Sequence, residues 1–189
     1  MIEIEYLKCH VWTKNQMLEW HLLFVFSDEH HIFVLYMVLE SKVNMNISLE
    51  EIDKANYESV CDLDVADTQE EYVACNMWSL VESFYNTGYT CRAIYSDNLP
   101  VGFLMWVQES PYKISIWRFM VDKSYQNKGI GREALTQAID AIKQSPTVKE
   151  IEICYDPKNP VAKEFYSSFG FQEVGLDEED DDMLAIIRL

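Results

Sequence analysis

The stretch Gln126-Asn127-Lys128-Gly129-Ile130-Gly131-Arg132 lies between a predicted strand over residues 114–121 and a helical pattern that Gly129 opens. Glycines at such a place let backbone N–H groups approach an anion, because no side chain stands in the way. The N-terminus of the helix adds partial positive charge, and Lys128 and Arg132 add two full charges. We expect a phosphate group to bind here. The alternative is a tight strand-to-helix turn without a ligand, since the loop is neither a Walker loop nor the dinucleotide fingerprint.

A second motif decides between these interpretations. Asn159-Pro160-Val161-Ala162-Lys163-Glu164-Phe165-Tyr166 precedes Ser167-Ser168-Phe169-Gly170-Phe171. Together, the glycine loop and this motif resemble two motifs of the GNAT superfamily of acetyl-CoA-dependent N-acetyltransferases. The spacing of the motifs and the order of the elements agree with that superfamily over about residues 47–189. The resemblance implies an α/β (α+β) fold, with a mixed, mostly antiparallel sheet flanked by helices.

The resemblance also implies where acetyl-CoA, the co-substrate, binds. Its pyrophosphate is expected on the loop residues Gln126, Asn127, Lys128, Gly129, Ile130, Gly131 and Arg132. Two central strands should separate near Met120 and Val121, so that free backbone groups hydrogen-bond the pantetheine arm. Asn159 is expected to hold the arm from the other side. Tyr166 takes the position of the family's general acid, which protonates the CoA thiolate as it leaves. The alternative interpretation of Tyr166 is an aromatic residue of the core.

A narrower resemblance concerns the acceptor. Residues 72–82 look like the second helix of bacterial diamine and spermidine acetyltransferases, and residues 116–122 look like their central strand. The predicted reaction is therefore acetyl transfer to a primary amine by direct attack, with a polyamine or diamine such as spermidine or spermine favoured. The alternatives are an acetyltransferase for a protein N-terminus, a lysine or an aminoglycoside, and a non-catalytic acyl-CoA sensor. Analogy also admits a homodimer.

The general base is not evident from the sequence. Some polyamine acetyltransferases carry a glutamate where Trp117 aligns, and this chain has Trp117 and Arg118 there instead. Glu82 is our candidate for binding the amine or for deprotonating it through water, and its alternative is an exposed helix residue. Trp117 is a candidate for stacking on a cationic substrate, or else a core residue.

The charge of the chain bears on its partners. Its 189 residues include 15 basic and 32 acidic ones, for a formal net charge of −17. Such a surface repels phosphate backbones, so nucleic-acid binding is not expected. The acidic run over residues 177–182 would attract a polycation, or would be only a solvated turn.

The remaining residues indicate a cytoplasmic protein without a metal site. The cysteine count is odd and no Cys-x-x-Cys is present, which fits reduced thiols. All four histidines lie within the first 31 residues, and a metal site among them has little support. No secretory signal or bilayer-spanning segment is expected.

The chain is expected to divide into residues 1–45, an N-terminal extension of unknown role, and a catalytic domain over residues 46–189. The first 44 residues either precede a natural start at Met45 or pack as extra strands on the domain. Residues 32–39 read as a buried strand or a short helix. Further along, helices are expected from Asp53 to Leu63 and over residues 69–85, and the last two strands form an antiparallel pair.

Overall fold

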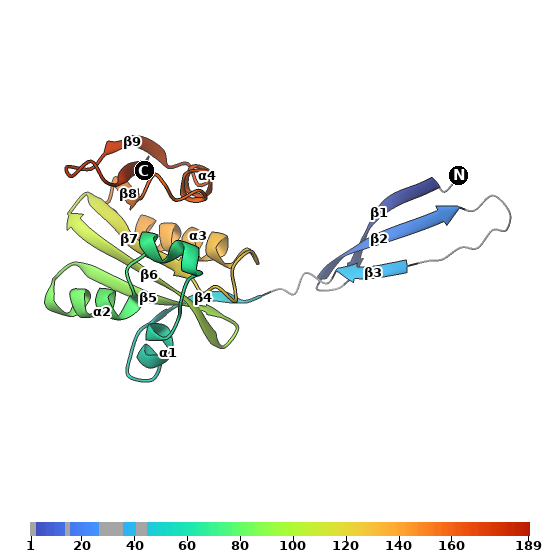
Figure 1. Cartoon of the computed structure of the whole chain (residues 1–189), viewed down its shortest axis with the longest axis horizontal. Helices are drawn as coiled ribbons and strands as arrows, with labels where there is room; N and C mark the ends of the chain where they lie inside the picture. The colour runs from blue at the N-terminus through green and yellow to red at the C-terminus, as the bar shows by residue number, and fades with distance from the viewer. Residues whose placement is uncertain (1–2, 14–15, 27–35, 41–44) are drawn as a thin grey trace. The chain divides into compact units, whose positions relative to one another are not determined.

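The computed structural model describes the backbone of residues 3–13, 16–26, 36–40 and 45–189, and the side chains of residues 45–189. The chain forms two compact units, Met1–Asn44 and Met45–Leu189. In the first unit, β1 (Glu3–Thr13), β2 (Gln16–Phe26) and β3 (Tyr36–Glu40) form an antiparallel sheet in that order (Figure 1). Residues 32–35 of the expected apolar element and the histidine side chains lie outside the described part.

The second unit contains a seven-stranded sheet with the order β4-β5-β6-β7-β8-β10-β9. The strands are β4 (Ile47–Glu51), β5 (Tyr89–Ser96), β6 (Leu99–Ser110), β7 (Lys113–Val121), β8 (Glu150–Tyr155), β9 (Gln172–Leu176) and β10 (Met183–Arg188). All neighbouring strands are antiparallel except β7 and β8. This arrangement confirms the predicted mixed, mostly antiparallel sheet and the closing pair of strands.

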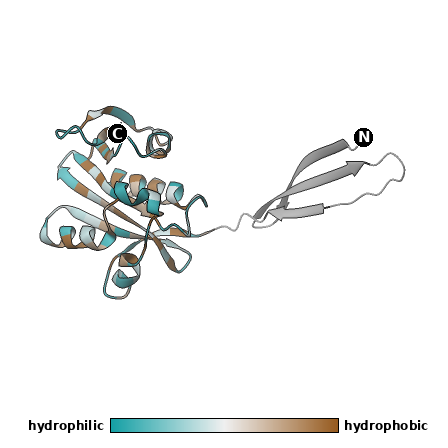
Figure 2. Ribbon diagram, in the orientation of Figure 1, coloured by the Kyte–Doolittle hydropathy of each residue, from teal (hydrophilic) through white to brown (hydrophobic). Residues whose placement is uncertain are grey.

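Helices cover both faces of this sheet. They are α1 (Tyr57–Cys61), the 3₁₀ helix η1 (Asp67–Tyr72), α2 (Asn76–Tyr85), α3 (Ile130–Lys143) and α4 (Ala162–Ser167). Because side chains alternate along a strand, β6 supplies Leu104 to one core and Phe103 to the other. The first core contains the apolar side of α3, including Leu135 and Ile139, together with Ala162 of α4. The second contains Val60 of α1, and Figure 2 shows the hydrophobic strands between the two layers.

Two predicted helices differ from the structure. The helix expected from Asp53 begins only at Tyr57, because Asp53 accepts a hydrogen bond from the Ala55 N–H (2.7 Å) and so stabilises a turn. The single helix expected over residues 69–85 is two elements, η1 and α2. Val73 and Cys75 between them have extended backbone angles, which end the first helix before the second begins.

The neighbouring strands β7 and β8 separate partway along their length. They pair from Lys113 and Glu150 as far as Ile116 and Ile153. Beyond that pair, β7 continues to Val121 without a partner on the β8 side. Trp117 is the extra residue of a bulge against β6, whose Met105 and Trp106 pair with Arg118 and Ile116. The separation expected near Met120 and Val121 therefore starts earlier, at Trp117.

Candidate active site

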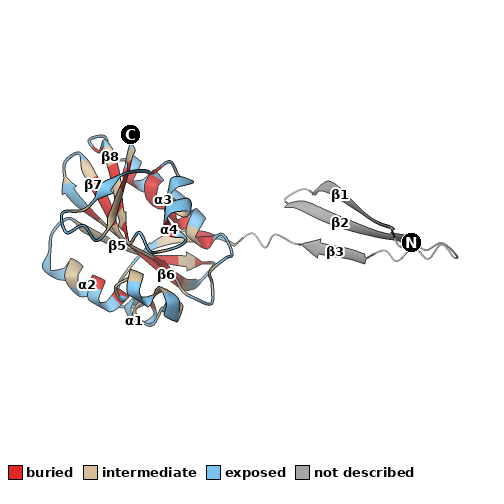
Figure 3. Cartoon of the chain, turned by 45° about the horizontal axis from the view of Figure 1, so that its top comes forward, coloured by how far each residue is buried: buried red, intermediate tan, exposed pale blue. Residues whose placement is uncertain are grey.

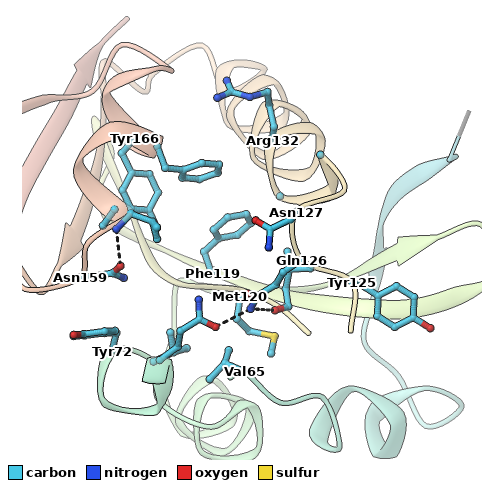
Figure 4. Close-up of a pocket in the computed structure, with 18 residues that line it drawn as sticks. Val65, Tyr72, Phe119, Met120, Tyr125, Gln126, Asn127, Arg132, Asn159 and Tyr166 are labelled. Atoms are coloured by element: carbon cyan, nitrogen blue, oxygen red, sulfur yellow. Dashed lines mark hydrogen bonds between the residues drawn. The ribbon is translucent and has the colours of Figure 1, made fainter. Parts of the chain in front are cut away.

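A pocket of about 380 Å³ lies where β7 runs without its neighbour (Figure 4). Phe119, Met120 and Val121 of β7 form its base. Its walls come from η1, from the glycine loop with the start of α3, and from α4. We call this cavity the loop pocket. Of the residues that the sequence predicted for cofactor binding, it brings together Met120, Val121, Gln126, Asn127, Gly129, Gly131, Arg132 and Asn159.

The glycine loop leaves the N-terminus of α3 open toward this pocket. Gly129 is the N-cap residue with φ +82°, a conformation that favours glycine, and it offers no side-chain cap. The first helical bond is donated by the Glu133 N–H to the Gly129 carbonyl (3.1 Å), so the N–H groups before it have no helix carbonyl to bond. The Arg132 guanidinium lies over the Phe169 ring and donates to Ser168 Oγ (3.0 Å). The site therefore combines backbone donors with one positive side chain.

Three loop residues have structural roles. Gln126 also lines the pocket, whereas Lys128 and Ile130 do not. Gln126 Nε2 donates to Gln69 Oε1 (2.8 Å) and to the Val121 carbonyl (2.9 Å), which ties the loop to η1 and β7. Ile130 is buried in the first core and does not line the pocket. Lys128 donates to the Ser124 carbonyl and lies over the Tyr125 ring, also outside the lining.

Tyr166 stands at the junction of the loop pocket and a second, smaller cavity. Its ring contacts the rings of Tyr155, Phe165 and Phe171. Within the described residues the Tyr166 hydroxyl makes no hydrogen bond. The neighbouring Tyr155 hydroxyl, by contrast, donates to Glu173 Oε1 (2.8 Å). Burial, and then the neighbouring Cys154 and Tyr155, raise the pKa of Tyr166. The phenol is therefore protonated at neutral pH and able to donate.

The second cavity, of about 120 Å³, lies on the other side of Tyr166 and is lined by Arg118, Cys154, Asp156 and Asp182 among others. We call it the Asp182 pocket. Burial raises the pKa of Asp182, and so do Asp177, Asp156 and Asp181, while Arg118 acts in the opposite direction. A cation in this cavity would lower that electrostatic cost. Sequence reasoning missed Asp156, which carries no local signal and enters the site only because β8 ends here.

Of the acidic run, only Asp182 reaches this cavity. Glu178 to Asp181 are exposed, and Asp177 Oδ1 accepts hydrogen bonds from the N–H groups of Asp181 (2.9 Å) and Asp182 (3.2 Å). Asp177 thus holds the turn in shape. The run therefore combines a solvated turn with one carboxylate that the turn presents to the site.

Glu82 is not the exposed helix residue of the alternative interpretation. Its side chain and that of Arg118 are each 23% exposed, with 3.6 Å between Glu82 Oε2 and an Arg118 terminal nitrogen. Glu82 Oε2 and Arg118 Nε are buried and make no hydrogen bond within the described residues. A buried acceptor and donor without hydrogen-bond partners are costly, and water could satisfy both. Arg118 lines the Asp182 pocket, whereas Glu82 lines neither cavity.

The other predicted substrate contact, Trp117, lines the Asp182 pocket. Its ring meets Tyr89 edge to face, and its indole N–H donates to Glu109 Oε1 (3.3 Å). Part of the ring therefore packs on the second core, as the core interpretation expected.

Tyr72 and Phe119, which sequence reasoning did not place in the site, line both cavities. The Tyr72 hydroxyl donates to the Lys158 carbonyl (3.4 Å), so it joins η1 to the turn that carries Asn159. Within residues 45–189, no group of histidine, cysteine and carboxylate side chains could hold a metal ion. No helix in the described part of the chain is long and apolar enough to cross a membrane.

The sequence pattern of the Acetyltransferase (GNAT) family matches the chain over residues 57–171. The chain therefore belongs to this family. It is an acetyl-CoA-dependent N-acetyltransferase. The matched residues run from the start of α1 through the glycine loop and α4 to the residue before β9.

Among curated proteins, the chain is similar to the spermine/spermidine N(1)-acetyltransferase of Bacillus subtilis strain 168. The two are 27% identical over 135 residues, which cover 68% of this chain and 89% of the relative.

Two solved structures show the same fold. PaiA N-acetyltransferase of Thermoplasma acidophilum, in complex with coenzyme A, has a TM-score of 0.59 at 17% identity, covering 77% of this chain and 100% of that one. Spermidine N-acetyltransferase of Vibrio cholerae, in complex with CoA and spermine, has a TM-score of 0.62 at 16% identity, covering 75% and 95%.

Proposed function

We propose that this enzyme acetylates a primary amine of a polyamine such as spermidine or spermine. The observation that carries the proposal is the half-buried carboxylate of Asp182, which shares a cavity with Asp156 and Tyr166. A polyamine brings several positive charges and would pair with both carboxylates. The Bacillus subtilis relative named for spermine and spermidine supports the same acceptor class.

The loop pocket would hold acetyl-CoA. Its pyrophosphate would accept hydrogen bonds from the N–H groups around Gly129, Ile130 and Gly131, with Arg132 supplying charge and Asn127 and Lys128 at the rim. The pantetheine arm would run along Met120 and Val121, whose backbone has no β8 partner, toward Asn159. Gln126 would position this wall through its hydrogen bond to Gln69.

The reaction would proceed by direct attack at the junction of the two cavities. The nitrogen lone pair of the neutral amine forms a bond to the thioester carbonyl carbon, the C–S bond breaks, and Tyr166 gives its proton to the CoA sulfur. The amine loses a proton, which returns through solvent to the tyrosinate. Burial raises the pKa of Cys154 to about 11, so this neighbouring thiol stays protonated and is a poor nucleophile. A covalent acetyl-cysteine route is therefore disfavoured.

The amine must lose a proton before it attacks, because a primary amine near pKa ~10 is mostly charged at neutral pH. Glu82 is our proposed acceptor, through a water molecule, since its buried Oε2 accepts no hydrogen bond from the described residues. Arg118 would hold that carboxylate in place. Trp117, which lines the cavity, would contact the methylene chain of the substrate.

The test compares two single substitutions in the acidic run. Asp182→Asn removes the charge that faces the cavity, and Asp180→Asn removes an exposed charge nearby. Asp180 has φ +61°, a conformation that asparagine also tolerates, so the control keeps its backbone. We expect Asp182→Asn to raise KM for spermidine about tenfold, equivalent to about 1.4 kcal/mol. Asp180→Asn should change KM by less than about twofold, because exposed charges are screened.

CoA affinity, measured by calorimetry, should be the same in both variants and in wild type. Equal KM values for spermidine in the two variants at low salt would remove the physical support for a polyamine acceptor. A protein or drug amine would then be the better candidate.

A further inference from the structure

A third cavity lies beside the loop pocket and the Asp182 pocket, and neither substrate accounts for it. Its volume is about 260 Å³. The turn between α1 and η1 lines it with Leu63, and the segment between η1 and α2 lines it with Ala74. The cavity therefore lies on the side of the sheet that carries α1 and α2 (Figure 3). We call it the Leu63 pocket.

The Leu63 pocket adjoins the place where the reaction is proposed to occur. Val65, Val73 and Met120 line both this cavity and the loop pocket, and Figure 4 shows Val65 and Met120 at the base of the loop pocket. Val73 also lines the Asp182 pocket, so it borders all three cavities. An acyl group at the junction of the loop pocket and the Asp182 pocket would therefore lie beside Val73, with the Leu63 pocket next to it.

The inner walls of the Leu63 pocket are apolar. Leu63, Val65, Val73 and Met120 belong to the second hydrophobic core. The buried Asn76 also lines the cavity, but its Nδ2 donates to the Val60 carbonyl (2.8 Å) and to Met120 Sδ (3.7 Å). That amide nitrogen therefore has its partners within the protein. A hydrocarbon chain would gain free energy by leaving water for such walls.

The two carboxylates of the Leu63 pocket lie at its mouth. Asp64 and Glu70 line the cavity and are both exposed. Asp64 Oδ2 is paired with Lys123 Nζ (2.9 Å), so its charge already has a partner. An exposed carboxylate such as that of Glu70 attracts a cation only weakly, because water screens the charge. The cavity therefore suits an apolar chain better than the far end of a polyamine.

A flexible side chain stands at the boundary between the loop pocket and the Leu63 pocket. Met120 is 6% exposed and lines both cavities. Methionine is unbranched and has three rotatable side-chain bonds, so it adapts to the shape of its surroundings. The side chain can therefore turn aside while the backbone of β7, along which the pantetheine arm would run, stays in place. The boundary is one that an acyl chain can pass.

We propose that the enzyme also uses acyl-CoA donors longer than acetyl-CoA, such as hexanoyl-CoA, and that the carbons beyond the second occupy the Leu63 pocket. This inference rests on the proposed placement of the acyl donor in the loop pocket. A hexanoyl chain has four more methylene groups than acetyl. Each takes up roughly the ~30 Å³ of a water molecule in the liquid, so the chain fits within the cavity of about 260 Å³.

The chemical step is the one proposed for acetyl transfer. The amine nitrogen forms a bond to the thioester carbonyl carbon, the C–S bond breaks, and the CoA sulfur takes the proton of Tyr166. The nitrogen loses one proton, which returns through solvent to the tyrosinate. The products are free CoA and an N-hexanoyl amine, and the rest of the chain is unchanged.

The test compares acetyl-CoA and hexanoyl-CoA on the full chain and on two matched variants. Leu63→Phe places a ring in the Leu63 pocket, and Leu63 lines neither of the other two cavities. Leu99→Phe makes the same change at an exposed residue of β6 that lines none of the three. Calorimetry without an amine gives the affinity for each donor. Mass spectrometry of the products with spermidine shows which acyl group is transferred.

We expect wild type and Leu99→Phe to bind hexanoyl-CoA about tenfold more tightly than acetyl-CoA, because each fully buried methylene group strengthens binding about fourfold. In Leu63→Phe this preference should fall below about twofold, with acetyl-CoA affinity unchanged. Equal affinities in wild type would overturn the proposal, and so would a preference that survives in Leu63→Phe. A raised KM for spermidine in Leu63→Phe with the donor preference intact would assign the cavity to the amine instead.

A second readout needs no variant. The thiol of Cys75 is exposed and lines the Leu63 pocket. Hexanoyl-CoA should slow alkylation of Cys75 by iodoacetamide at least about threefold relative to acetyl-CoA, and equal rates would contradict the proposal. A wild-type enzyme that binds hexanoyl-CoA in this way but does not acylate spermidine would count against the polyamine acceptor alone, since neither the calorimetry nor the alkylation involves an amine.

Discussion

Replacing Tyr166 by phenylalanine removes one hydroxyl and leaves the ring in place. The ring makes the contacts with Tyr155, Phe165 and Phe171, and the hydroxyl bonds to none of the described residues. The unfolding free energy should therefore change by less than about 0.5 kcal/mol. If the hydroxyl is the acid that protonates the departing CoA sulfur, kcat should fall about 10²-fold or more. That factor corresponds to about 2.7 kcal/mol of transition-state stabilisation.

Tyr155→Phe is the matched control. Tyr155 also lines the Asp182 pocket, but its hydroxyl donates to Glu173 Oε1 (2.8 Å), and its pKa is raised to about 12 by burial and by this partner. Its loss should lower stability by about 1 kcal/mol and change kcat by less than about threefold. Tyr166→Phe should thus lower kcat with little change in stability, whereas Tyr155→Phe should lower stability with little change in kcat.

The assay is steady-state CoA release with acetyl-CoA and spermidine, together with urea unfolding and CoA calorimetry on each variant. Wild-type kcat in a folded Tyr166→Phe enzyme would refute the general-acid role. A parallel loss of CoA affinity would instead place the residue among cofactor contacts.

Three further predictions follow from the geometry. Gly131→Ala should raise the melting temperature, because alanine favours a helix and its Cβ would meet Phe119 and Val121 at an ordinary 3.6 Å. The added methyl group should nevertheless weaken CoA binding about tenfold, because it fills part of the pocket. Unchanged CoA affinity by calorimetry would contradict this expectation. Gln126→Ala should raise KM for acetyl-CoA with kcat nearly unchanged, since it loses the bonds to Gln69 and the Val121 carbonyl; a fall in kcat alone would count against it. The pKa of Asp182 is higher in the folded protein than in the unfolded chain. Its contribution to the free energy of unfolding is therefore present at low pH and is lost as the pH rises through the folded-state pKa. Asp182→Asn should therefore stabilise the protein at pH 7, and urea unfolding should show the gain shrinking as pH falls toward about 4.

The elements around the glycine loop could be predicted because local signals agree there. The apolar period of α3 places Ala134, Leu135 and Ile139 in the core, and the structure buries all three. Gly129, at the start of α3, has φ +82°, a conformation that favours glycine. Such signals lie within a few residues of one another in sequence.

The direction of α2 could not be predicted in the same way. Periodicity shows that one side of a helix is apolar, and that side ordinarily meets the core, but in α2 the apolar residues Met77, Val81 and Phe84 are exposed. Here the buried hydrogen bond from Asn76 to the Val60 carbonyl decides the rotation, and Val60 is 16 residues away. The cavity residues Asp156 and Gln69 have the same difficulty, because each enters the site from a different element.

The acceptor preference of the enzyme can be measured by product analysis with acetyl-CoA and equal concentrations of spermidine, a simple alkylamine and a short peptide with a free N-terminus. Mass spectrometry of the products, with CoA release measured in parallel, gives the relative kcat/KM for the three amines in one mixture. We expect spermidine to gain one acetyl group for each CoA released and to outcompete the alkylamine and the peptide. Equal acetylation of the alkylamine, or preferential acetylation of the peptide, would contradict the assignment of the Asp182 pocket to a polycation.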